Sequence, residues 1–283
     1  MKRLEALIDG LQEFRETYYA ENQELFESLA HGQKPKFLFI TCSDSRVDPN
    51  LITHSDIGEL FVLRNAGNIV PPFGSANGGE GAAIEYAITA LGIEQVIICG
   101  HSHCGAMKGL LKLSELETEM PLVYEWLRHS EGTLRLVKDN YTSYSNEELI
   151  EITIAENVLT QIDNLKTYPI VRSRLYQGKL KIYGWIYHIE TGEVLAYDPV
   201  THAYKHPQSD LASPSEAGKK SLGQFIDHNS RPLVCNLPFS TPKAQKVAKA
   251  EPKAIVPDLP ATANLPLATS PQQAARIYRG SKR

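Results

Sequence analysis

Residues 37–46 read FLFITCSDSR, and residues 95–104 read QVIICGHSHC. Each stretch is a short, nearly continuous apolar run of strand length, which is typical of a strand buried on both faces of a parallel sheet. Each run ends in side chains that bind metals or carry charge: Cys42, Asp44 and Arg46 in the first, His101 and Cys104 in the second. Because sites in such sheets form where parallel strands end, we expect these side chains to meet.

The rest of the body continues this pattern. Further strands are predicted at residues 60–63, 179–188 and 193–197, and helices at 80–91 and 150–165. Apolar residues at helical spacing predict amphipathic helices in an N-terminal arm, residues 1–31. The predicted fold class is α/β, with a mostly parallel β-sheet core flanked by α-helices.

The chain changes character near residue 205. Residues 206–283 hold 10 of the 17 prolines and 11 Lys/Arg against 5 Asp/Glu, which leaves 18 against 28 in residues 1–205. We therefore predict a folded catalytic domain at 1–205 and a largely disordered, basic extension at 206–283, with a short helix at 272–278 that forms on a partner. The acidic body argues against a nucleic-acid enzyme. The chain contains no run long and apolar enough for a membrane span, so a cytoplasmic protein is expected.

The two clusters predict a zinc site. Two thiolates and one imidazole, from Cys42, Cys104 and His101, suit Zn²⁺, and three protein ligands leave the fourth tetrahedral position for a water molecule. Two thiolates formally neutralise the ion, so this water should be less acidic than one held by three neutral histidines. Activity is then expected to rise on the alkaline side. Three buried residues without a metal are the alternative, and Cys99, inside its apolar run, is interpreted as a small buried hydrophobe.

Asp44 and Arg46 stand two residues apart on the same loop. A charge-assisted pair between them would keep the carboxylate ionised and oriented, so that Asp44 accepts a hydrogen bond from the zinc-bound hydroxide. Two other interpretations stay open at this point. Asp44 itself can take the fourth zinc position and close the site, or the two residues can form a surface ion pair without a role.

Four stretches resemble the β-class carbonic anhydrases, particularly their plant and cyanobacterial branch: GQKPKFLFITCSDSRVDP, FVLRNAGNIVPP, GGEGAAIEYA and GHSHCGAMKGLL, which together lie within residues 10–200. The resemblance implies one zinc ion per subunit, held by Cys42, His101 and Cys104, and an Asp44–Arg46 dyad beside it. It also implies a carbonate dehydratase (a lyase) in which zinc-bound hydroxide attacks CO2 to give bicarbonate.

The resemblance further implies a substrate pocket made by Gln33, Phe61 and Tyr86. An amide of Gln33 can donate to an oxygen of CO2 or bicarbonate, and the two aromatic rings offer an apolar wall to an uncharged substrate. In the family, part of this pocket comes from the neighbouring subunit. A homodimer, or an assembly of dimers, is therefore expected as the active unit.

The last residues, QQAARIYRGSKR, resemble the end of the C-terminal extension in cyanobacterial carboxysomal members of the family. That resemblance implies docking to the carboxysome scaffold protein, and hence a role in supplying CO2 for photosynthetic carbon fixation inside this bacterial microcompartment. Two rivals stay open: a relative that hydrolyses carbonyl sulfide or carbon disulfide, and a scaffold component in which zinc only stabilises the fold.

Overall fold

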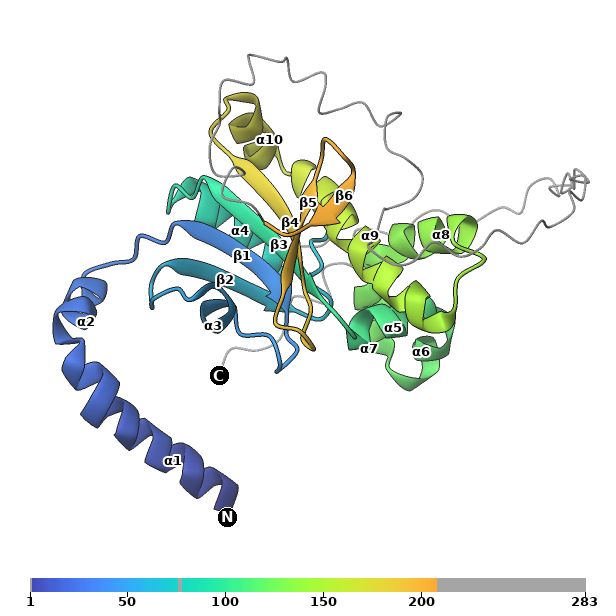
Figure 1. The fold of residues 1–283 in the computed structure, drawn as a ribbon. Coiled ribbons are helices and arrows are strands. Elements are labelled where there is room, and N and C mark those ends of the chain that lie inside the picture. The colour runs from blue at the N-terminus through green and yellow to red at the C-terminus, as the bar shows by residue number, and fades with distance from the viewer. Residues whose placement is uncertain (1, 76–77, 208–283) are drawn as a thin grey trace, which may run out of the picture. The chain divides into compact units, whose positions relative to one another are not determined.

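The computed structural model describes residues 2–75 and 78–207 of the chain (Figure 1). These residues all lie in the first of the two units into which the chain divides, Met1–Thr241 and Pro242–Arg283. The predicted extension, apart from its first two residues, and the predicted helix at 272–278 lie outside the described residues. None of the described helices combines the length and the apolar character needed to cross a membrane.

A six-stranded sheet with the order β2-β1-β3-β4-β5-β6 forms the centre of the described unit. The strands are β1 (Phe37–Cys42), β2 (Leu60–Asn65), β3 (Gln95–His101), β4 (Lys181–Tyr187), β5 (Val194–Asp198) and β6 (Ala203–Lys205). The first four are parallel, and β5 and β6 are antiparallel to their neighbours. The predicted mostly parallel sheet is thus confirmed. The three-residue β6 was not predicted, because a strand so short carries no readable alternation.

Helices precede the sheet and form the connections from β1 to β2, from β2 to β3 and from β3 to β4. They are α1 (Lys2–Phe14), α2 (Gln23–Ala30), α3 (Pro49–Thr53), α4 (Gly79–Thr89), α5 (Gly105–Leu111), α6 (Leu113–Glu119), α7 (Pro121–Leu127), α8 (Glu131–Asn140), α9 (Asn146–Lys166) and α10 (Pro169–Tyr176). A π-helical turn, Arg15–Tyr19, joins α1 to α2, and a 3-10 turn, Arg128–Ser130, precedes α8. The predicted N-terminal helical arm is therefore present.

The apolar side chains of α1 are exposed in the single protomer. Leu4, Leu7 and Leu11 are 65%, 69% and 70% exposed. These residues recur at the spacing that places them on one side of a helix. A surface helix with an uncovered apolar stripe is typical of an element that packs against another molecule.

Helix α9 is the longest helix in the described part of the chain and packs directly on the sheet (Figure 1). It starts with a capping box, in which the Ser145 hydroxyl accepts from the Glu148 N–H while the Glu148 carboxylate accepts from the Ser145 N–H. Two glycines in the strands beneath allow the close approach. A Cβ at Gly100 would meet Val158 Cγ2 at 3.0 Å, and a Cβ at Gly184 would meet Val158 Cγ1 at 2.9 Å.

The two faces of the sheet have separate apolar clusters, as the alternation of side chains along a strand requires. Leu38 and Ile40 of β1 belong to the large core shared with α9. Phe39, between them, packs on the opposite face with Ile97 and Cys99, flanked by aromatic side chains. The interpretation of Cys99 as a buried hydrophobe is confirmed, and burial raises the pKa of its thiol to about 12.

Strand order fixes the place of the site. Because β1 and β3 are neighbours and parallel, with Thr41 opposite Cys99, their carboxyl ends adjoin at one edge of the sheet. The Thr41 hydroxyl donates to the Cys99 carbonyl over 2.9 Å and ties the two strand ends together. The residues that follow each strand therefore meet in space although about 60 positions separate them in sequence.

Candidate metal centre

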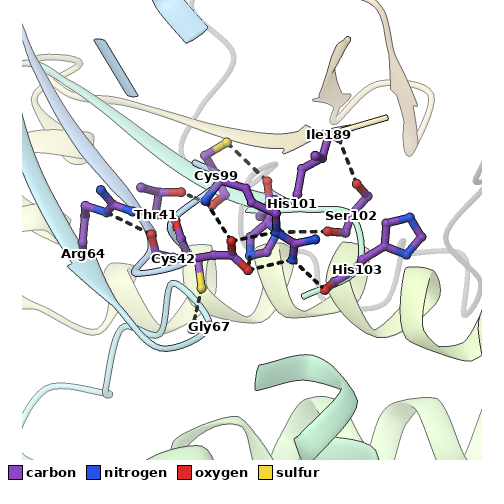
Figure 2. A network of polar contacts seen from close by, with 12 residues as sticks. Thr41, Cys42, Arg64, Gly67, Cys99, His101, Ser102, His103 and Ile189 are labelled. Carbon is purple, nitrogen blue, oxygen red and sulfur yellow. Dashed lines mark hydrogen bonds and ion pairs between the residues drawn. The ribbon is translucent and has the colours of Figure 1, made fainter. Parts of the chain in front are cut away.

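Three side chains converge at the joined ends of β1 and β3. Cys42 is the last residue of β1, His101 is the last residue of β3, and Cys104 precedes the first turn of α5. All three are buried, and their ligand atoms lie within 4.8 Å of one another. Figure 2 shows this region with its network of polar contacts. The structure thus brings together the three residues that the sequence predicts as metal ligands.

His101 is held in the orientation that a metal ligand requires. Its Nδ1 lies 2.9 Å from the Ser102 carbonyl, to which it donates as the protonated nitrogen (Figure 2). The proton on Nδ1 leaves the lone pair on Nε2. Nε2 is buried and has no hydrogen-bond partner among the described residues. A buried, unpaired acceptor is costly, and a cation at this point satisfies it.

The two cysteine sulfurs interact strongly. The pKa of Cys42 lies well below its usual value, chiefly because the Cys104 thiol donates to its sulfur; burial opposes this effect, and the adjacent His101 and the Gly67 N–H add to it. The same pairing raises the pKa of Cys104. Two sulfurs this close do not ionise together unless a cation lies between them. The donor set therefore fits zinc, which binds deprotonated cysteines and neutral histidine.

Asp44 and Arg46 form a two-point ion pair beside this set. Arg46 Nε donates to Asp44 Oδ1 over 2.9 Å and Arg46 Nη2 donates to Oδ2 over 2.8 Å, while the Arg46 backbone N–H donates to Oδ1 over 3.0 Å. These hydrogen bonds hold the pKa of the Asp44 carboxyl well below its usual range. Asp44 Oδ2 lies 3.9 Å from His101 Nε2, so the carboxylate faces the metal centre.

Sequence reasoning missed residues that hold this loop in place. Arg64 Nε donates to the Cys42 carbonyl over 3.1 Å, and Arg64 Nη2 donates to the Asp44 carbonyl over 2.7 Å (Figure 2). The Gly67 N–H donates to Cys42 Sγ at 3.4 Å. The sequence signal for Arg64 was its position: a charged residue near the carboxyl end of a predicted parallel strand.

The three predicted substrate residues lie elsewhere in the protomer. Phe61 and Tyr86 are neighbours, with ring centroids 6.2 Å apart. Phe61 is opposite Leu38, which precedes Cys42 by four residues, or about 13 Å of strand. Gln33 is exposed and lies before the amino end of β1, whose first residue, Phe37, is about 17 Å of strand from Cys42. One protomer therefore does not gather these side chains around its own metal centre.

A mostly parallel α/β sheet that carries a buried Cys/His/Cys set at its carboxyl edge has the three protein ligands typical of a zinc-dependent enzyme. The carbonic anhydrase family model matches residues 37–194, which include the whole metal centre. A carbonic anhydrase from Synechocystis sp. is 53% identical over 283 residues, which span 99% of this chain and 100% of that protein.

Solved structures give the class. The β-carbonic anhydrase CcaA is similar with a TM-score of 0.73 and 63% identity, over 74% of this chain and 94% of that one. A β-carbonic anhydrase from Sordaria macrospora, one of two described as tetrameric, is similar with a TM-score of 0.63 and 26% identity, over 69% of this chain and 97% of that one. The chain belongs to the carbonic anhydrase family, in its β class. It is a zinc-dependent lyase, and the resemblance noted from its motifs is confirmed.

Proposed function

We propose that this chain catalyses the reversible hydration of CO2 to bicarbonate and a proton by zinc-hydroxide chemistry at Cys42, His101 and Cys104. The observation that carries the proposal is the convergence of these three buried ligand atoms within 4.8 Å, with His101 Nε2 left free of a protein partner. When bound, zinc supplies a Lewis acid that makes a water molecule nucleophilic near neutral pH.

Asp44 and Arg46 act as an orienting pair in this proposal. Asp44, kept ionised by Arg46, accepts a hydrogen bond from the attacking water and so aligns its lone pair with the carbon of CO2. The two-point pairing with Arg46 occupies both carboxylate oxygens. Asp44 would have to break this pair to become a fourth metal ligand. The observed arrangement therefore supports an open site that admits water.

The experiment for the metal ligands compares Cys42→Ser with the matched variant Cys99→Ser. Both replace one buried thiol by a hydroxyl on neighbouring strands, but only Cys42 belongs to the ligand set. Stopped-flow CO2 hydration and zinc content should both collapse in Cys42→Ser, while Cys99→Ser keeps its zinc. Full zinc content and full rate in Cys42→Ser would overturn the ligand assignment.

We also propose that the substrate pocket is shared between two copies of the chain, with Gln33, Phe61 and Tyr86 of one copy lining the metal centre of the other. Two observations support this. Phe61 lies about 13 Å of strand from Cys42 of its own protomer, Tyr86 is next to Phe61, and Gln33 lies before the amino end of β1. Tyr86 is 49% exposed, as expected of an aromatic ring that a second copy covers.

Mixed assemblies test the shared pocket. A Cys42→Ser chain and a Gln33→Ala/Tyr86→Ala chain are each expected to be inactive alone. In a mixed dimer, the intact metal centre of the second chain meets the intact pocket residues of the first, so one of the two sites is complete. Mixing should then restore up to half of the wild-type rate. If each copy used its own pocket residues, no site in the mixture would be complete and the rate would stay low.

Finally, we propose that residues 206–283 attach the enzyme to a carboxysome scaffold protein. One support is the match to the cyanobacterial relative, which covers 99% of the chain and so includes this segment. The other is the basic character of residues 206–283, which hold 11 Lys/Arg and 5 Asp/Glu. Deleting residues 206–283 should leave CO2 hydration nearly unchanged and abolish co-purification with the scaffold. Arg276→Ala/Arg279→Ala in the full chain is the finer test, since it keeps the length of the segment. Unchanged co-purification of both variants would reject the docking role.

A further inference from the structure

The segment between β2 and α4 approaches the metal centre through one glycine. Gly67 has a φ of +81°, and its N–H donates to Cys42 Sγ over 3.4 Å. A Cβ at this position would meet Met107 Cε at 2.8 Å and Ala106 Cβ at 3.1 Å, so only glycine fits against α5. An N–H that points at a thiolate stabilises its charge and fixes its direction. The geometry of this loop therefore bears directly on a metal ligand.

The loop is tied at both ends of the glycine. Asn65 forms a ring with Ile69, donating from Nδ2 to its carbonyl over 2.8 Å and accepting from its N–H over 2.7 Å. Trp126 Nε1 donates to the Ala66 carbonyl over 2.8 Å. The Ala66 carbonyl and the Gly67 N–H belong to one peptide unit, so the Trp126 bond holds that unit from one side. None of these bonds reaches the Gly67 carbonyl, on the other side of the glycine.

Asn157 of α9 makes the bond to the glycine. Its Nδ2 donates to the Gly67 carbonyl over 3.0 Å, and its side chain is buried. The orientation of this amide is determined, because Asn157 Oδ1 accepts from Ser130 Oγ over 3.0 Å and from Gln161 Nε2 over 2.8 Å. With its oxygen facing two donors, the nitrogen must face the Gly67 carbonyl.

We propose that Asn157 is a positioning residue for the carbonic anhydrase reaction. It acts through Gly67: by fixing the Gly67 carbonyl it limits rotation at this glycine, and so keeps the Gly67 N–H, on the other side of the Cα, directed at the Cys42 sulfur. It thereby sets the charge on that sulfur and the strength of zinc binding. The inference rests on the proposed role of Cys42 as a zinc ligand. Partners that orient metal ligands typically change metal affinity by about 10- to 100-fold when they are removed.

The test uses Asn157→Asp and the matched control Thr160→Val. Aspartate still accepts from Ser130 and Gln161, but its second oxygen faces the Gly67 carbonyl and repels it. Thr160 lies one turn further along α9 and accepts a hydrogen bond from Thr133 of α8 over 2.9 Å, without reaching the loop. The Thr160→Val substitution therefore removes a polar contact of α9 with α8 and leaves the contacts of the loop in place.

Two readouts separate positioning from folding. Zinc affinity, measured by competition with a chromogenic chelator, should weaken about tenfold in Asn157→Asp and change less than twofold in Thr160→Val. In the cobalt-substituted protein, the sulfur-to-cobalt charge-transfer band of Asn157→Asp should move to longer wavelength, because a sulfur that has lost its N–H donor gives up an electron more readily. A folded Asn157→Asp protein with wild-type affinity and an unmoved band would overturn the proposal.

Failure of the underlying assignment gives a different result. If wild-type protein with cobalt shows no sulfur charge-transfer band, Cys42 is not a ligand and both proposals fall together. If wild type shows the band and Asn157→Asp does not differ from it, only the role of Asn157 falls. Should Asn157→Asp not fold, Trp126→Phe removes the donor to the Ala66 carbonyl, in the peptide unit that carries the Gly67 N–H, and about tenfold weaker zinc binding is expected. Unchanged zinc binding in Trp126→Phe would then refute the proposal.

Discussion

Replacing Gly184 by alanine tests how closely α9 must approach the sheet. The new Cβ would lie 2.9 Å from Val158 Cγ1 and 3.0 Å from Ile162 Cδ1, whereas ordinary contacts are 3.4 to 4 Å. Helix α9 or its side chains must therefore shift by about half an ångström. Overpacking of this kind in a close-packed core costs about 1–3 kcal/mol. For a domain of this size, each 1 kcal/mol lowers Tm by about 2–4 °C, so a fall of about 2–12 °C is expected.

The matched control is Gly132→Ala. Gly132 lies inside α8, and a Cβ there meets nothing within 4 Å. Alanine is favoured over glycine in a helix by about 1 kcal/mol, so this variant should melt at the same temperature or slightly higher. Thermal unfolding of the two zinc-loaded variants, followed by circular dichroism, gives the comparison. Equal Tm values for Gly184→Ala and wild type would show that the contact between α9 and β4 is looser than the structure has it.

Further predictions concern the site. Asp44→Asn should keep its zinc but lose at least about 10²-fold in hydration rate, because the amide no longer orients the attacking water; an unchanged stopped-flow rate would remove Asp44 from the chemistry. Arg46→Lys loses the two-point pairing and frees Asp44 to compete with hydroxide for the fourth zinc position. The rise of the pH–rate profile should then move to higher pH. An unmoved profile would contradict the pairing role of Arg46. Because the pKa of the Asp44 carboxyl is depressed, the carboxylate stays ionised from pH 5 to 9 and does not titrate there. An increase of the wild-type hydration rate with pH over this range should therefore reflect formation of hydroxide. Removal of zinc by a chelator should lower Tm, since zinc at 100 times its Kd stabilises the folded state by about 2.7 kcal/mol; equal melting of the two forms would argue that the Cys/His/Cys set binds no metal.

The ligand set was predictable from the sequence because the metal-binding residue types stand at the ends of two apolar runs. Cys42 and His101 end two apolar runs, and the runs proved to be neighbouring parallel strands. Cys104 follows His101 by three residues, so placing one ligand also places the other. The strands were predictable from their continuous apolar runs, and the helical arm from apolar residues at helical spacing.

Residues that act across long sequence separations were not predictable. In the sequence, Asn157 is one of several polar residues in a predicted helix, and its contact with Gly67, 90 positions away, depends on how α9 crosses the sheet. The placement of Gln33 and Phe61 relative to the metal ligands likewise follows from strand register. Their motifs indicated a pocket, but only the register shows that they lie far from the ligands of their own chain.

X-ray absorption at the zinc edge of the wild-type protein tests the central claim most directly. The proposed site predicts a four-coordinate shell with two sulfur atoms at about 2.3 Å and two nitrogen or oxygen atoms at about 2.0–2.2 Å, one of them from His101 and one from solvent. A shell without sulfur, or one with four sulfur or histidine ligands from the protein, would contradict it.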